Sequence, residues 1–341
     1  MNKENINWIF NLRIIASFAV IVLHVSSPIV VNYSSIGLSS WFASNFFDSI
    51  SRFCVPVFVM ISGTLLLGKS EDINVFLQKR VKRILFPFLF WTLVYLFFNV
   101  FIFNTVEVHS FVEFLMKFFR SIWFGSAFHF WYIYMIIGIY LMTPIINPWV
   151  NTTNNKGFLY FFCIWSVSVF FLQSNFERYK PNFDLIYFSK YLGYFILGYF
   201  LNKNDFSRYK KMILIIYFLS LSVIVFGTFY FSFKENSFSG GLYDYFNFFV
   251  IFNSVSIFLI FKYFLNFNLI GYRFFINLNN DSYGIYLIHI LVLLIFSEIG
   301  LNGMLMHPLI GIPFVAIVCL IVSALMVNGL KRITLIKNLI G

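Results

Sequence analysis

Long apolar stretches separated by short polar loops recur along this sequence. About 20 apolar residues suffice for a helix to cross the hydrocarbon core of a bilayer, and only helices or closed barrels satisfy their backbone there. The stretches lie at residues 8–31, 45–67, 84–103, 127–146, 157–173, 185–201, 212–233, 243–265, 281–299 and 308–329. We therefore predict an all-α polytopic membrane protein, a bundle of about ten transmembrane helices. The loop at 104–126 has the apolar spacing of an amphipathic interfacial helix.

Composition and charge agree with a membrane protein. Only 11% of the residues are charged and 60% are apolar, whereas a soluble protein has about 25% charged residues. The net charge of +11 is too scattered to indicate nucleic acid binding. It sorts by loop instead: the predicted inner loops and tail hold Lys69, Lys79, Arg80, Lys82, Arg83, Lys203, Arg208, Lys210, Lys211, Arg273, Lys331, Arg332 and Lys337, against Lys117, Arg120, Arg178, Lys180, Lys190 and Lys234 outside.

This asymmetry predicts where the protein lies and how it is oriented. Lys and Arg favour cytoplasmic loops, so both termini are expected in the cytoplasm. The first apolar stretch lacks a small-residue cleavage site and is read as a retained span. We expect residues 1–341 to form a single integral-membrane domain, multi-pass in the cell inner (cytoplasmic) membrane.

Arg13 and His24 share one face of the first predicted span. Eleven residues on a helix return nearly to the same azimuth, and the two positions are about 16 Å apart along the axis. Ionisable groups inside a membrane are costly and usually functional. We predict that they line a polar pore, with His24 as general base and Arg13 near an anionic ligand. The alternatives are an interhelical hydrogen bond for His24 and snorkelling for Arg13.

Two further regions predict a binding site for an anion at the cytoplasmic mouth. Arg80 and Arg83 are three residues apart and can form a phosphate clamp, although a topogenic cluster explains them as well. The ninth span begins DSYGIYLIH, in which Asp281 or Ser282 can cap the helix. In that motif Gly284 would let another group approach closely, and His289 can support His24 or bond a neighbouring helix.

Four residues near the outer ends of spans are candidates for contact with a second substrate. Asp48 and Arg52, at i and i+4, can form a structural ion pair or touch the substrate. His129 enters the fourth span from outside and can face an acceptor. Trp131 is explained equally well by an aromatic interfacial belt.

Several familiar chemistries lack their motifs in this sequence. It contains no G-x-S-x-G, H-E-x-x-H or G-x-x-x-x-G-K-[ST] pattern, and no Cys/His cluster with metal-ligand spacing. We therefore expect no bound metal, and hydrolase, metalloprotease and nucleotide-driven pump functions are disfavoured.

Five stretches taken together resemble the membrane-bound acyltransferase-3 family. They are NWIFNLRIIASFAVIVLH (7–24), RFCVPVFVMISGTLL (52–66), RVKR (80–83), HFWYIYMIIGIYLMTPII (129–146) and SYGIYLIH (282–289). They follow the family's order over nearly the whole chain. The resemblance is strongest to compact members that act as surface-polysaccharide O-acetyltransferases, among them those of enterobacterial common antigen.

The resemblance implies an enzyme that moves an acyl group, usually acetyl, from cytoplasmic acyl-CoA to a sugar hydroxyl. The acceptor would be a surface glycan or its polyprenyl-linked precursor, reached from the surrounding membrane lipid. By the same resemblance, His24 is the essential acid/base residue, Arg13 with Arg80 and Arg83 holds acyl-CoA, and Ser282, Tyr283 and Gly284 form the family's SYG motif. Acetyl-CoA is then a donor substrate, and no cofactor is bound permanently.

The main alternative is a transporter or flippase of a lipid-linked glycan, with the polar stripe as its path. Internal repeats or broken helices in matching halves would favour transport, and the sequence shows neither. A membrane scaffold is a third possibility, but it leaves the Arg13–His24 stripe unexplained. Release of free coenzyme A on adding acceptor separates the enzyme from both.

Overall fold

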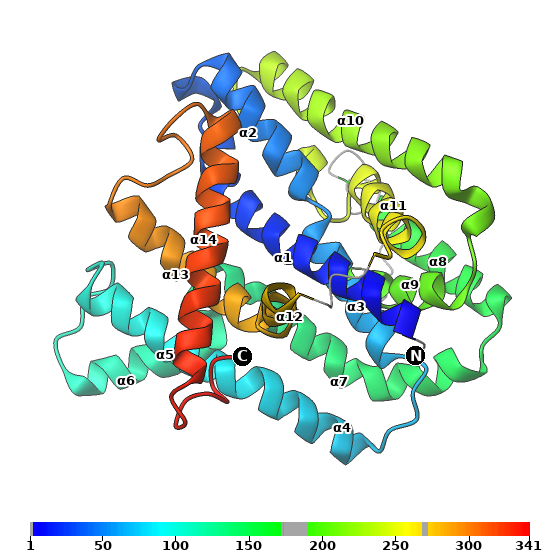
Figure 1. The fold of residues 1–341 in the computed structure, drawn as a ribbon, viewed down its shortest axis with the longest axis horizontal. Coiled ribbons are helices and arrows are strands. Elements are labelled where there is room, and N and C mark those ends of the chain that lie inside the picture. Colours follow the sequence, from blue (N-terminus) through cyan, green and yellow to red (C-terminus); the bar gives the residue numbers. More distant parts are fainter. Residues whose placement is uncertain (1–2, 172, 174–189, 268–271) are drawn as a thin grey trace.

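The computed structural model describes residues 3–171, 173, 190–267 and 272–341, which form helices and connecting loops with no strand among them (Figure 1). The α-helices are α1 (Lys3–Val30), α2 (Leu38–Ser51), α3 (Cys54–Leu66), α4 (Ile73–Arg80), α5 (Phe86–Phe101), α6 (Phe111–Phe124), α7 (Trp131–Thr152), α8 (Asn155–Phe170), α9 (Tyr191–Lys203), α10 (Lys210–Glu235), α11 (Phe248–Tyr263), α12 (Arg273–Asn280), α13 (Ser282–Glu298) and α14 (Pro308–Lys331). The predicted all-α class is confirmed.

Seven helical segments in the described part of the chain are long and apolar enough to cross a membrane, or eight if the bent pair α12–α13 is one span. The protein is thus a multi-pass membrane protein. The count of about ten and the orientation stay predictions. α8 and α9 are short. The predicted span at 185–201 begins outside the described residues, and Arg178 and Lys180 also lie outside them.

Two predicted span boundaries were wrong. The second candidate span is Leu38–Leu66 rather than 45–67, and the third is Ile73–Phe101 rather than 84–103. The serines before position 45 look like a loop in sequence, but helix α2 already begins at Leu38. Its residues Ser44 and Asn45 are buried, and Asn45 donates to the carbonyl of Val225 at 3.0 Å. The basic residues of α4 likewise look like a loop, yet helical backbone continues through them into α5.

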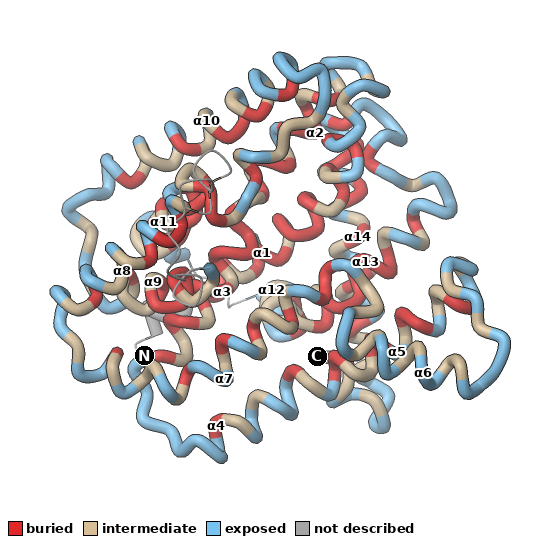
Figure 2. The backbone as a smooth tube through the Cα atoms, turned by 180° about the vertical axis from the view of Figure 1, so that it is seen from behind, coloured by how far each residue is buried: buried red, intermediate tan, exposed pale blue. Residues whose placement is uncertain are grey.

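Helix α1 runs through the middle of the bundle (Figures 1 and 2). It contacts α2, α3, α11, α12, α13 and α14. Its residues Trp8, Leu12, Ala16 and Ile21 are almost completely buried, so most of its surface faces protein rather than lipid. The amphipathic helix predicted within 104–126 is α6, which begins at a Ser110 side-chain cap and has no buried residue.

Helices α3 and α9 pack closely together, with small residues where their backbones meet. A Cβ atom at Gly63 would lie 1.7 Å from the carbonyl oxygen of Phe195, and one at Gly198 would lie 2.1 Å from that of Met60. Small residues at helix interfaces let backbones approach in membranes. The hydroxyl of Thr64 adds a hydrogen bond to the carbonyl of Gly198 at 3.0 Å.

Regular helix is interrupted at three places, each beside residues that the sequence analysis selected as candidates for the site. α2 ends at Ser51 and α3 begins at Cys54, next to Arg52. A π-helical turn, η2 (Val81–Leu85), separates α4 from α5; it begins directly after Arg80 and contains Arg83. α12 and α13 are bent by 79° at their junction. Irregular backbone of this kind in membrane proteins is tolerated where it is buried in protein or lines a cavity.

Two ends of the bundle can be distinguished by contacts between loops. At one, called the basic end, the 67–72 loop meets α7, where Gly68 donates to the side chain of Asn147 at 2.9 Å. Arg80, Lys82 and Arg83 follow this loop. At the other, called the distal end, Ser39 and His307 lie 3.1 Å apart and the indole of Trp41 donates to the carbonyl of Val30.

Candidate active site

A cavity of about 400 Å³ lies between the helices and collects most of the residues predicted from sequence. Its walls come from α1, α3, α7 and α13, with contributions from η2 and the loop before α11. The predicted residues that line it are Arg13, His24, Arg80, Arg83, His129, Trp131, Ser282 and Tyr283. Arg13 and His24 both line this cavity, as their common helix face led us to expect, and their roles in binding and catalysis stay predictions.

Arg13 lines the cavity wall nearer the amino end of α1. Its Nη1 donates to the side-chain oxygen of Asn279, at 3.3 Å, in α12. Arg83 lines the same part of the cavity and lies close enough for the two guanidinium charges to repel each other. An anion between them would relieve that repulsion and accept charge-assisted hydrogen bonds.

Arg80 and Arg83 reach the same cavity across the π-helical turn. The guanidinium of Arg80 stacks over the Phe76 ring, at 4.9 Å from its centroid, and lies 5.9 Å from that of Tyr140. The Arg80 Nε is buried and, in the described part of the chain, has no hydrogen-bond partner. Lys69, which sequence reasoning did not select, adds another cation to this wall. The cavity wall at the basic end is therefore positively charged.

His24 lies deeper, next to two other histidines. Its ring centroid is 5.3 Å from those of His289 and Phe128, and His129 lies 5.4 Å from His289. The Nδ1 of His289 is 2.7 Å from the carbonyl oxygen of Tyr286. Because a carbonyl only accepts, Nδ1 carries a proton and the neutral ring keeps its lone pair on Nε2.

The histidine cluster is polar but incompletely satisfied. The Nε2 of His289 and both ring nitrogens of His129 are buried with no hydrogen-bond partner among the described residues. Buried polar atoms normally have partners, so such a group indicates a place for a ligand or water. His289 itself does not line the cavity; its ring packs against that of His24, and its role in supporting His24 stays a prediction.

The SYG motif divides into residues that line the cavity and one that does not. Ser282 and Tyr283 line it, and the Tyr283 hydroxyl donates to the carbonyl of Ile84 at 3.2 Å. Gly284 is buried elsewhere: a Cβ there would lie 3.0 Å from Val327 and 3.1 Å from the Ile340 carbonyl. The structure thus places Gly284 in helix packing, away from any ligand in this cavity.

Asp281 does not cap α13 with its side chain, contrary to one of the two options read from sequence. Its carboxylate instead accepts hydrogen bonds from Lys331 at 2.7 Å and from Asn328 at 3.2 Å, both in α14. This ion pair holds the start of α13 against α14. The amino end of α13 consequently stays open toward the cavity at Ser282.

Asp48 and Arg52 form the buried ion pair predicted from their spacing. The Ser26 hydroxyl donates to Asp48 at 3.5 Å, and the Arg52 guanidinium lies 4.1 Å from the centroid of Tyr243. Neither residue lines the cavity. The structure therefore places them as a structural pair beside the site and not in its wall.

Sequence reasoning missed the tyrosines of this cavity: Tyr132, Tyr140, Tyr245 and Tyr286 all line it. The chain contains 20 tyrosines and 51 phenylalanines, so no single aromatic residue stands out in the sequence. Their selection depends on which helices meet, and that is visible only in the fold.

These features define a class: a polytopic helical membrane protein with an enclosed cavity, cationic at one end and carrying a histidine cluster further in. The chain belongs to the acyltransferase-3 family, because residues 6–328 match the family described as "Acyl_transf_3: Acyltransferase domain". It is thus a membrane-embedded acyltransferase. Comparison with curated proteins and with solved structures gave no match.

Proposed function

We propose that the protein is an O-acyltransferase that moves an acetyl or other short acyl group from acyl-CoA to a sugar hydroxyl. The acceptor is a cell-surface polysaccharide or its polyprenyl-linked precursor, and the enzyme acts in the cell inner membrane. The observation that carries this proposal is the single cavity shared by Arg13, Arg80, Arg83 and His24. Membership of the acyltransferase-3 family supports the reaction class.

The basic end suits the phosphates of coenzyme A. Arg13, Arg80, Arg83 and Lys69 all line this wall, and arginine presents a planar fork that binds phosphate oxygens in pairs. With the phosphates held there, the long pantetheine arm would extend along the cavity. Its thioester would then lie near His24, about 16 Å from Arg13 along the α1 axis.

His24 would act as the base in a direct transfer. Its neutral imidazole takes the proton of the sugar hydroxyl while the oxygen attacks the thioester carbonyl. The carbon–sulfur bond then breaks, and the imidazolium returns the proton to the leaving thiolate, giving an O-acyl sugar and free coenzyme A. Holding both substrates in one enclosed space would supply much of the rate acceleration. His289 would keep the His24 ring oriented.

The clamp can be tested by the affinity for acetyl-CoA. Arg80→Ala and Arg83→Ala should each weaken acetyl-CoA binding to the purified protein in nanodiscs, because charge-assisted hydrogen bonds to phosphate contribute about 1.5–3 kcal/mol each. Lys82→Ala is the matched control, since Lys82 belongs to the same basic turn but does not line the cavity. Equal affinities for all three variants and the unmodified protein would return the arginines to a topogenic role.

Sidedness tests the whole proposal. In sealed vesicles of known orientation, acetyl-CoA added on the side of the N-terminus should support transfer, and acetylated glycan should form at the opposite face. Acetyl-CoA on the other side should have no effect. If unmodified lipid-linked glycan crosses the membrane without acyl-CoA, the protein is a flippase and the enzymatic proposal is wrong.

A further inference from the structure

Three aromatic rings from separate elements meet beside the cavity, and two of them, Trp131 and Tyr245, form part of its wall. The centroid of Trp131 lies 5.7 Å from that of Tyr191, with the planes at 35°, and 6.1 Å from that of Tyr245, with the planes at 32°. Trp131 begins α7, Tyr191 begins α9 and Tyr245 precedes α11. We call these three residues the aromatic platform.

The platform opens into the reaction cavity. Trp131 and Tyr245 line the cavity that also holds His24, and the Trp131 side chain is 40% exposed. The helices that begin here, α7 and α9, reach their other ends near Asn147 and Lys203, toward the basic end. A molecule on the platform would therefore approach His24 from the direction opposite to the arginines.

A carboxylate completes the arrangement. Asp244 is exposed, next to Tyr245 in the chain, and close enough to Tyr191 and Tyr245 to interact electrostatically with both. Its Oδ1 accepts the backbone N–H of Phe246 at 2.6 Å, which fixes its orientation. The other carboxylate oxygen retains acceptor capacity for a hydroxyl group.

We propose that the aromatic platform with Asp244 binds a sugar ring of the acceptor, which deepens and rests on the proposed transfer to a glycan. The C–H groups on a pyranose face carry partial positive charge and pack against the negative face of aromatic rings. A carboxylate at the rim accepts sugar hydroxyls. An apolar wall with few fixed polar groups is the usual construction of a small-molecule site.

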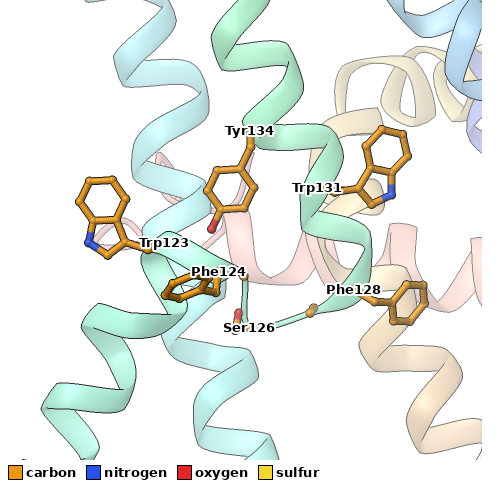
Figure 3. A pocket seen from close by; sticks show the side chains of 8 residues that line it. Trp123, Phe124, Ser126, Phe128, Trp131 and Tyr134 are labelled. Atoms are coloured by element: carbon orange, nitrogen blue, oxygen red, sulfur yellow. The ribbon is translucent and has the colours of Figure 1, made fainter. Parts of the chain in front are cut away.

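Ordinary interfacial aromatics supply the contrast. Trp123 and Phe124 line a neighbouring pocket of about 380 Å³, which Trp131 also borders (Figure 3). The two residues are 79% and 80% exposed and do not line the cavity that holds His24, and the Trp123 ring lies on the opposite side of Tyr134 from the Trp131 ring. Trp123 fits an aromatic belt in contact with lipid and gives a matched control for Trp131.

The experiment measures retention of glycolipid and transfer separately. The probe is radiolabelled lipid-linked glycan extracted from a strain lacking this gene, mixed with the full-length protein in nanodiscs without acyl-CoA. Trp131→Ala and Tyr245→Ala should each raise the half-saturating concentration of the probe about tenfold, equivalent to about 1.4 kcal/mol. Asp244→Asn should weaken binding by a smaller factor. Tyr245→Phe keeps the ring and should weaken binding less than Tyr245→Ala, whereas Trp123→Ala, outside the platform, should bind normally.

The outcomes distinguish this proposal from the proposed function. If the unmodified protein transfers acetyl groups but the platform variants bind and transfer as it does, the platform is wrong and the enzymatic function stands. If binding follows the predicted order but no transfer occurs with acetyl-CoA, the platform stands and the enzymatic function fails. Displacement of the probe by a polyprenyl phosphate lacking sugar, or no retention at all, would overturn the sugar assignment. Because Trp131 and Tyr245 border the cavity proposed for acyl-CoA, acetyl-CoA affinity is measured in parallel and should fall by a smaller factor than affinity for the probe.

Discussion

Replacing Gly198 by alanine should destabilise the bundle at the α3–α9 contact. The added Cβ would lie 2.1 Å from the backbone oxygen of Met60, and backbone cannot rotate aside as a side chain can. The helices would have to separate, weakening the Thr64 hydrogen bond to the Gly198 carbonyl. Overpacking costs about 1–3 kcal/mol. A loss of about 2 kcal/mol raises the unfolding equilibrium constant about 30-fold.

The assay is reversible unfolding of the purified protein in mixed micelles, with Gly138→Ala as control. Gly138 is in α7, and a Cβ there meets nothing within 4 Å. Alanine is a better helix former than glycine by about 0.5–1 kcal/mol, so the control should be unchanged or slightly stabilised. If Gly198→Ala is as stable as Gly138→Ala, the close packing of these helices is wrong.

The consequence extends to the site, because α3 forms one wall of the cavity through Val55, Phe58 and Ile61. Displacing α3 should therefore also lower the affinity for acetyl-CoA, even though Gly198 does not line the cavity. Gly138→Ala should leave that affinity unchanged.

Two other substitutions test the polar contacts around the site. Asp48→Asn leaves the Arg52 charge buried without its partner and should cost about 3–5 kcal/mol in unfolding free energy, whereas replacing both residues with apolar ones should cost much less; equal losses would show that the pair is not buried as described. Asp281→Asn should weaken the contact between the start of α13 and Lys331 and so increase backbone hydrogen exchange at the start of α13. The control is Lys79→Met, which breaks only an exposed ion pair with Glu71. Unchanged exchange in Asp281→Asn would rule out a role for Asp281 in holding this helix.

Much of the site was predictable because charge in a membrane is costly. Arg13 and His24 stand out in an apolar stretch, helical geometry puts them on one face, and both line the cavity. Arg80 and Arg83 reach it too, although the π-helical turn that follows Arg80 and contains Arg83 was not expected. A single extra residue per turn leaves no clear trace in composition, so the sequence could not indicate it.

The features missed by sequence reasoning depend on tertiary packing. Gly284 was expected to let another group approach closely, and the groups that do so are Val327 of α14 and the backbone of Ile340, which the sequence could not name. Asp281 was expected as a possible helix cap, but its carboxylate accepts a hydrogen bond from Lys331, which is far away in the sequence. Tyr245 carries no sequence signal, yet the fold places it in the wall of the cavity that His24 also lines. Each depends on a partner that only the folded chain identifies.

Release of free coenzyme A by His24→Gln tests the central claim most directly. Glutamine keeps hydrogen-bonding capacity but cannot take up a proton at neutral pH. With acetyl-CoA and lipid-linked glycan, the unmodified protein should release coenzyme A in proportion to acetylated glycan. The variant should bind acetyl-CoA with unchanged affinity and lose about 100-fold or more of the rate, the usual contribution of a general base. Near-normal release by a folded His24→Gln protein would contradict the account.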